Sequence, residues 1–221
     1  MIGTQFHCQY PGCPGVPGKE PPFFGTIKCP SGEGHDLVCG PQVTVDAILE
    51  HRGRIVLIKR AKGGVAAETW ALPGGFVNFR ERLVDAVVRE ATEETGLEAA
   101  QVRFFEVYDD PKRDMADSRN NVSLVYTAIG IGSLKLTPDE KGRYEVAAAR
   151  CFTYEEIRDE EFRPCPGNAG PGAWLAVVAP GMGISLDDLD QGKFEIGFDH
   201  EEILRDYLRR MRTGDPGAIP Y

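Results

Sequence analysis

The segment Arg82–Thr95 constrains both the fold and the chemistry of this chain more than any other. Apolar residues recur along it at helical spacing, so we expect an amphipathic helix that packs one face against a sheet. Gly96 follows directly, at a position where glycine commonly ends a helix. Glu90, Glu93 and Glu94 lie at positions i, i+3 and i+4, so they project from one helical face. Three carboxylates this close repel one another unless positive charge lies among them.

A divalent cation is one source of that charge. Mg²⁺ prefers carboxylate oxygens and keeps coordination places for water and phosphate. Arg89 lies one helical turn before Glu93 and can brace its carboxylate. Gly74 and Gly75 permit a sharp turn before the helix, and Glu81 is close enough to approach the same face. The alternative is a solvated acidic face of an amphipathic helix, which a bare Glu-x-x-Glu-Glu run would favour.

The complete pattern from Gly75 to Leu97 separates the two interpretations. It reads Gly-x5-Glu-x7-Arg-Glu-U-x-Glu-Glu-x-Gly-U, with U a bulky aliphatic residue, and it resembles the motif of the Nudix hydrolases. Ala91 departs from the motif at the first U, a position that packs rather than reacts. The resemblance covers about residues 41–158 and the last helix. It implies an α/β fold, the Nudix α/β/α sandwich with a mixed β-sheet.

The resemblance also implies roles for the acidic residues. Glu90 and Glu94 would be direct ligands of Mg²⁺ or Mn²⁺, and Glu81 and Glu93 would assist through a second ion or bound water. Arg89 would orient the carboxylates. The expected reaction is attack of water on phosphorus in a nucleoside diphosphate derivative. The metal would neutralise the pyrophosphate and lower the pKa of the water.

The residue that takes the proton from the water often lies outside the motif in Nudix enzymes. Asp139, Glu140 and Glu145 precede the strand that ends at Phe152. Glu145 is the first choice for this catalytic base, because related sequences often place acidic residues just ahead of this strand. The alternative for each of the three is an exposed loop acid without a catalytic role.

Three further stretches resemble the ADP-ribose pyrophosphatases within the Nudix family: residues 70–77, 108–114 and 198–204. In the second, Lys112 and Arg113 can meet a phosphate of the substrate as hydrogen-bonding cations, although an ordinary polar loop explains them equally well. Cleavage of ADP-ribose would yield AMP and ribose 5-phosphate. The residues expected to bind the substrate are Leu72, Gly74, Gly75, Lys112 and Arg113.

Other substrates and a non-enzymatic role remain open at this point. A Nudix hydrolase can act on NADH, sugar nucleotides or nucleoside triphosphates with the same motif. The chain does not contain the Ser-Gln-Pro-Trp-Pro-Phe-Pro motif of NADH pyrophosphatases. An ADP-ribose-sensing regulator without activity would generally show a damaged motif and an added DNA-binding domain. Here the motif is intact, and no helix-turn-helix pattern follows it.

Residues 1–40 form an extension rich in proline and glycine, followed by the expected hydrolase domain at 41–221. Strands are expected at 43–49, 54–60, 102–108, 122–129 and 146–152, and a last helix at 200–212. An irregular insertion is expected at about 159–193. The extension carries Cys8, Cys13, Cys29 and Cys39, which can hold a structural Zn²⁺. The alternative is a set of incidental thiols, because the spacing is not the Cys-x2-Cys of a zinc ribbon.

The net charge of −9 and the absence of a long basic run argue against nucleic-acid binding. No apolar run approaches the length of a membrane span, and Met1–Tyr10 does not resemble a secretory signal. We therefore expect a cytoplasmic enzyme that acts on a small nucleotide. A homodimer is expected from the resemblance, since many ADP-ribose pyrophosphatases are dimers.

Overall fold

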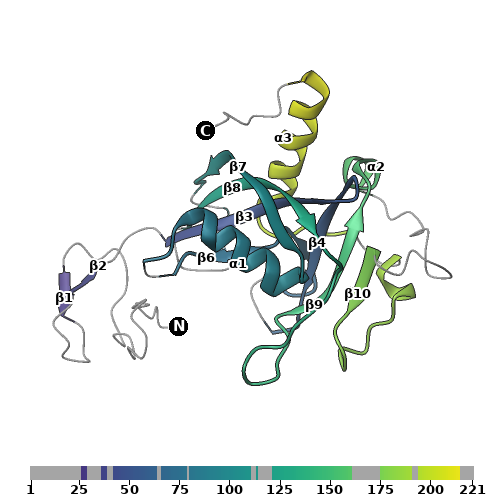
Figure 1. The fold of residues 1–221 in the computed structure, drawn as a ribbon, viewed down its shortest axis with the longest axis horizontal. Helices are drawn as coiled ribbons and strands as arrows, with labels where there is room; N and C mark the ends of the chain where they lie inside the picture. The colour runs from purple at the N-terminus through teal and green to yellow at the C-terminus, as the bar shows by residue number, and fades with distance from the viewer. Residues whose placement is uncertain are drawn as a thin grey trace.

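A computed structural model describes residues 26–28, 36–38, 42–63, 66–78, 80–110, 113, 121–160, 175–190 and 194–214. Its main feature is a mixed sheet of eight strands, shown in Figure 1. Six strands follow one another in the order β10-β9-β4-β3-β8-β7, while β5 pairs with β4 and β6 pairs with β3. The strands are β3 (Gln42–His51), β4 (Arg54–Arg60), β5 (Trp70–Ala71), β6 (Gly74–Phe76), β7 (Glu98–Tyr108), β8 (Asn121–Ile131), β9 (Val146–Phe152) and β10 (Ala176–Val178).

The central strand, β3, gives the sheet its mixed character. It pairs in parallel with β8, from Gln42 opposite Asn121 to Glu50 opposite Ile129. Its C-terminal end pairs antiparallel with β4 through a tight turn at Arg52 and Gly53, both of which have positive φ. Its N-terminal half pairs antiparallel with β6 instead. The segment Leu72–Gly74 therefore enters the sheet beside β3.

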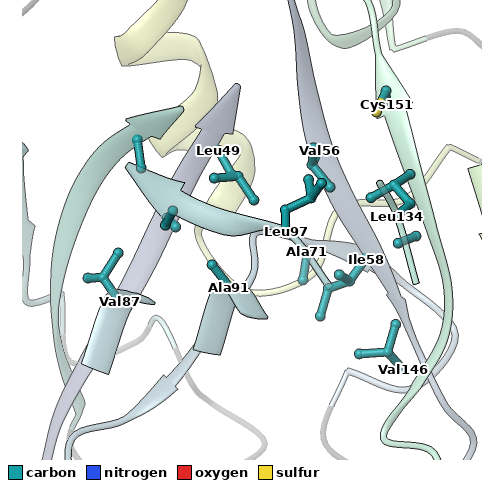
Figure 2. Close-up of a cluster of buried hydrophobic side chains, with 14 of the residues drawn as sticks. Leu49, Val56, Ile58, Ala71, Val87, Ala91, Leu97, Leu134, Val146 and Cys151 are labelled. Atoms are coloured by element: carbon teal, nitrogen blue, oxygen red, sulfur yellow. The ribbon is translucent and has the colours of Figure 1, made fainter. Parts of the chain in front are cut away.

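In the described part of the chain, three α-helices accompany the sheet: α1 (Leu83–Thr95), α2 (Tyr154–Asp159) and α3 (His200–Thr213). Alternate residues of β3 point to opposite faces of the sheet. Val45, Ala47 and Leu49 belong to one buried cluster with the inner face of α1, part of which Figure 2 shows. Ile48 belongs to a second cluster with Ile203, Leu204 and Tyr207 of α3. The helices α1 and α3 thus cover opposite faces, which confirms the expected α/β/α sandwich.

Local sequence explains where these helices begin and end. Gly96 ends α1 in the left-handed conformation, with φ of 74°, and its N–H donates to the carbonyl of Thr92. Thr153 and Glu156 form a capping box at the start of α2, where each side chain accepts from the backbone of the other. Gly214 ends α3 as Gly96 ends α1. None of the described helices is both long and apolar enough to cross a membrane.

The segment expected to be irregular, at about 159–193, contains regular structure in its described part. Strand β10 lies inside it and pairs antiparallel with β9, and a 3-10 helix follows at Asp187–Asp190. Leu175 and Leu189 in this segment are buried. The prediction of irregular structure was therefore wrong for residues 176–178, because a strand this short is specified by pairing with β9 rather than by its own pattern.

The N-terminal extension is described only at two short strands. β1 (Thr26–Lys28) and β2 (Asp36–Val38) pair antiparallel in a sheet of their own. The predicted zinc ligands Cys8, Cys13, Cys29 and Cys39 lie outside the described residues. Zinc binding and the boundary at residue 40 stay predictions.

Candidate active site

The pocket that gathers most of the predicted residues lies at the N-terminal ends of β3 and β8, beside β6 and α1. Its volume is about 370 Å³. Carboxylates, guanidinium groups and aromatic rings contribute to its wall, so the pocket offers both polar and apolar surface. Its lining residues are Thr44, Asp46, Arg60, Leu72, Gly74, Gly75, Phe76, Asn78, Arg89, Glu90, Glu94, Arg113, Asn121, Glu145, Phe198 and His200.

Two glutamates of α1 face this pocket across the glycine turn. The N–H of Gly74 donates to Glu94 Oε2 at 2.9 Å. The Glu90 carboxylate lies against Gly75, where an added Cβ would be 2.5 Å from Oε1 and 2.7 Å from Cδ. Packing therefore requires glycine at position 74, where a side chain would overlap the backbone of β3, and a side chain at position 75 would displace the Glu90 carboxylate. The turn holds both carboxylates in place.

Arg89 binds the remaining acidic groups of the motif. Its Nε and Nη2 donate to the two oxygens of Glu81, at 2.7 and 3.0 Å. Its Nη1 donates to Glu90 at 2.6 Å and to Glu93 at 3.2 Å, and Nη2 also donates to the carbonyl of Phe76. The hydrogen bonds from Arg89 lower the pKa of Glu81. A planar guanidinium suits this role, since its five donors can serve several oxygens at once.

The four glutamates predicted to bind metal, Glu90 and Glu94 directly and Glu81 and Glu93 through a second ion or bound water, have different surroundings. Glu90 and Glu94 line the pocket, whereas Glu81 is paired with Arg89. The side chain of Glu93 is 60% exposed and also contacts Arg89. Among the described residues, no group of three or more His, Cys, Asp or Glu side chains is arranged to hold a metal ion. Metal-binding roles for Glu81 and Glu93 stay predictions.

A pair of carboxylates nevertheless fits Mg²⁺, which usually takes one or two of them and completes its shell with water and phosphate. Burial is the main reason that the pKa of Glu90 is raised, with Arg89 opposing the rise. Burial also raises the pKa of Glu94 well above its usual value, and the charges of Glu90 and Asp46 add to the effect of burial. The protein itself thus supplies too little positive charge to stabilise both carboxylates in their ionised form. A divalent cation between them would supply the missing charge.

A buried polar network completes the pocket on the side away from α1. Asp46 of β3 accepts a short hydrogen bond from Ser123 Oγ, and His200 Nε2 lies 3.4 Å from its other oxygen. Burial opposes ionisation of Asp46, but His200, Ser123 and Arg113 outweigh burial and keep the pKa of Asp46 below its usual value. The prediction from sequence did not include Asp46. The one available indication was its position as an acid in the apolar run of residues 43–49.

The predicted substrate-binding residues have different surroundings. Gly74 and Gly75 line the pocket openly, whereas Leu72 is only 2% exposed. Arg113 also lines it, but its guanidinium donates to both oxygens of Asp199 at 2.8 Å and its side chain is 4% exposed. Lys112 lies outside the described residues. Arg60, which was not among the predicted residues, lines the same pocket with its guanidinium 5.5 Å from the ring centre of Phe198.

Of the three acids considered as catalytic base, only Glu145 lines the pocket with Glu90 and Glu94. Its backbone carbonyl accepts from the N–H of Ala61, which fixes the chain beside the end of β4. Asp139 instead closes its own loop, where its carboxylate accepts from the N–H groups of Lys141 and Arg143. Asp139 and Glu140 line only a neighbouring pocket, to which Glu90, Glu94 and Glu145 also contribute. Of the three acids, Glu145 is the one that lies beside the carboxylate pair in both pockets.

Residues 40–171 match the family model of the NUDIX domain, which is more than half of the 221-residue chain. The chain belongs to the Nudix family. An "ADP-ribose pyrophosphatase" of Methanocaldococcus jannaschii is 32% identical to this Nudix hydrolase over 173 residues, which are 78% of this chain and 76% of that protein. The intact motif and this similarity agree on a hydrolase.

Solved structures support the fold of this Nudix hydrolase. A NUDIX hydrolase from Nitrosomonas europaea is 21% identical, with a TM-score of 0.54 over 86% of this chain and 82% of the other. The NUDIX domain of Shewanella oneidensis NrtR, solved with ADP ribose, is 17% identical, with a TM-score of 0.53 over 80% of this chain and 90% of the other. At these identities the likeness concerns the fold alone.

Proposed function

We propose that this Nudix hydrolase is a Mg²⁺-dependent pyrophosphatase that cleaves ADP-ribose to AMP and ribose 5-phosphate. The observation that carries the proposal is the meeting of Glu90, Glu94 and Glu145 in one pocket. The similarity to the Methanocaldococcus jannaschii protein supports the choice of substrate. Mn²⁺ in place of Mg²⁺ and assembly as a homodimer in the cytoplasm are part of the same proposal.

In the proposed reaction, an oxygen atom of water forms a bond to one phosphorus of the pyrophosphate. The bond from that phosphorus to the bridging oxygen breaks, and the bridging oxygen leaves with the other phosphate. Glu90 and Glu94 would hold the cation, which neutralises phosphate charge and lowers the pKa of the water. Glu145 would accept the proton of the water. Arg89 keeps Glu81 and Glu90 in position.

The rest of the pocket suits the two ends of a dinucleotide. Arg60 places a cation near Glu94, where phosphate oxygens would lie, and guanidinium groups bind such oxygens well. Phe76 and Phe198 contribute apolar surface to the same pocket. An aromatic wall provides a stacking surface for a nucleobase or a ribose face. A cation near the carboxylates and aromatic rings in the same pocket match a pyrophosphate joined to a nucleoside.

The test is a panel assay with Mg²⁺, using ADP-ribose, NADH, sugar nucleotides and nucleoside triphosphates as substrates. We expect kcat/KM for ADP-ribose to exceed that for each of the others by at least about 10-fold, as differences in pocket contacts produce. The products should be AMP and ribose 5-phosphate in equal amounts. A higher kcat/KM for NADH or a triphosphate would contradict the substrate, and tight binding of ADP-ribose without turnover would favour a sensor.

Replacing Glu145 with glutamine should lower kcat by about 100-fold or more, because general-base catalysis commonly contributes this much. The measurement is kcat at saturating Mg²⁺ and saturating nucleotide. Glu140→Gln, which alters an acid that lines only the neighbouring pocket, should stay within about twofold of the wild type. A kcat of Glu145→Gln close to that of the wild type, or an equal loss in Glu140→Gln, would rule out Glu145 as the base.

A further inference from the structure

Two hydrogen bonds, linked by the backbone of Leu72–Gly74, connect the start of α3 with Glu94 of α1, on opposite faces of the sheet. The first involves His200, the first residue of α3, which is 3% exposed. Nothing in the Nudix motif accounts for a histidine buried beside the pocket.

The first contact decides the tautomer of a neutral imidazole ring. The backbone N–H of Leu72 donates to His200 Nδ1 at 2.9 Å, so this nitrogen carries a lone pair and not a proton. The proton of a neutral ring is then on Nε2, which lies 3.4 Å from Asp46 Oδ1. The ring is thus oriented by a carboxylate on one side and anchors a backbone amide on the other.

The carboxylate that orients the ring is itself fixed. Ser123 donates to Asp46 Oδ2, and Arg113 Nη2 lies 3.6 Å from the same oxygen. Arg113 binds Asp199, the residue just before His200, through two hydrogen bonds of 2.8 Å. Asp46 of β3, Ser123 of β8 and the Arg113–Asp199 pair together fix the position of the imidazole.

Beyond Leu72, the backbone leads directly to a carboxylate of the proposed metal site. The carbonyl of Pro73 accepts from the N–H of Ala47 at 2.8 Å, and the N–H of Gly74 donates to Glu94 Oε2 at 2.9 Å. A Cβ on Gly74 would be 2.9 Å from Asp46 Cα, so this backbone packs tightly on β3. Because only Pro73 separates the two amides, a displacement of Leu72 would be transmitted to the amide that holds Glu94.

We propose that His200 is a positioning residue for the metal site, acting on Glu94 through the backbone of Leu72–Gly74. It does not touch the metal or the substrate in this role. The inference rests on the proposed metal-binding role of Glu90 and Glu94, but not on the choice of ADP-ribose. Residues that orient metal ligands commonly change metal affinity by 10- to 100-fold when they are replaced.

Three substitutions separate the two contacts of the ring. In His200→Asn the side-chain oxygen lies as many bonds from the backbone as Nδ1, so it can still accept from Leu72. In His200→Gln the side-chain nitrogen corresponds to Nε2, so it can still donate to Asp46, but the acceptor for Leu72 is lost. His200→Ala removes both contacts. Leu204→Ala serves as the matched control, because it truncates a fully buried side chain of α3 that takes no part in these hydrogen bonds.

The measurement is the dissociation constant of the complex between Mn²⁺ and the full chain, without substrate. It is obtained from the electron paramagnetic resonance signal of free Mn²⁺. We expect it to rise about 10- to 100-fold in His200→Ala and His200→Gln. It should stay within about threefold of the wild type in His200→Asn and Leu204→Ala. In turnover, the concentration of Mg²⁺ at half-maximal rate should rise in the same variants, while KM for the nucleotide changes little.

Wild-type affinity in His200→Ala, or recovery by His200→Gln, would overturn the inference, as would equal losses in His200→Ala and Leu204→Ala. If His200→Ala does not fold, the comparison of the asparagine and glutamine variants decides. The variant Glu94→Gln distinguishes a failure of the proposed metal site from a failure of the positioning role of His200. If Glu94→Gln binds Mn²⁺ as the wild type does, the proposed metal site fails. If it loses Mn²⁺ while His200→Ala does not, only the positioning role fails.

Discussion

Replacing Glu94 with glutamine is expected to lower kcat/KM by about 1,000-fold and, at the same time, to stabilise the metal-free protein. Activity falls because one of two carboxylates that would hold the cation loses its charge, and a missing electrostatic contact of this kind commonly costs 100- to 1,000-fold. Glutamine keeps the shape and still offers an oxygen to the N–H of Gly74. The change should therefore remove charge without removing the contact that orders the turn.

The gain in stability follows from the pKa of Glu94, which burial and the nearby charges of Glu90 and Asp46 raise well above 4.5. A carboxyl group with a higher pKa in the folded state destabilises the fold as pH rises above the unfolded value. Without metal, Glu94→Gln should thus melt a few degrees higher than the wild type at neutral pH. The difference should shrink toward pH 4.5 and shrink again when Mg²⁺ is added.

Thermal unfolding of both proteins at several pH values, with a chelator or with Mg²⁺, measures this difference. Glu98→Gln is the matched control, because it removes one exposed carboxylate at the start of β7 and should change neither activity nor melting temperature appreciably. A lower melting temperature for Glu94→Gln under chelation would show that the carboxylate stabilises the apo fold. That result would contradict the inference that ionised Glu94 destabilises the metal-free protein.

The adjacent glycines should respond differently to alanine, although the two substitutions are chemically identical. In Gly75→Ala the new Cβ meets the end of the Glu90 side chain, 2.5 Å from Oε1, and this side chain can swing away. We expect activity to fall about 100-fold because Glu90 is displaced, with little loss of stability.

In Gly74→Ala the new Cβ overlaps the carbonyl of Val45 and lies 2.9 Å from Asp46 Cα, which are backbone atoms of the central strand. We expect a loss of about 3 kcal/mol in the free energy of unfolding.

Urea unfolding and Mn²⁺ binding separate the two effects. Gly75→Ala should unfold near the wild-type midpoint but bind Mn²⁺ weakly, whereas Gly74→Ala should unfold at a clearly lower midpoint. Equal destabilisation of the two variants would mean that the Glu90 side chain cannot move. Wild-type activity in Gly75→Ala would mean that the position of Glu90 against the turn is not needed for catalysis.

Much of the fold was predictable because its larger elements carry long apolar patterns. The expected strands at 43–49, 54–60 and 146–152 match β3, β4 and β9, and the expected helix at 82–95 matches α1. The short strands β5, β6 and β10 have two or three residues each, so pairing with β4, β3 and β9 specifies them. No periodicity can be detected in so few residues.

The candidate site was predictable where its residues lie close together in sequence. Helical spacing correctly paired Arg89 with Glu93 at i+4, but the shorter contacts of Arg89 are with Glu81 and Glu90. The partners of Asp46 could not be inferred, since Ser123 lies 77 positions away along the chain. Long-range contacts of this kind depend on strand register, which one sequence alone does not reveal.

The parallel pairing of β3 with β8 determines when the active site can form during synthesis of the chain. All of the motif from Gly75 to Leu97 leaves the ribosome before β8, because Asn121 is the first residue of that strand. Until β8 is synthesised, β3 lacks its parallel partner, and Asp46 lacks the hydroxyl of Ser123. Parallel pairing across such a long connection also forms slowly. A nascent chain can therefore contain every glutamate of the motif and still have no active site, so competence arises only when the second half of the sheet closes on the first.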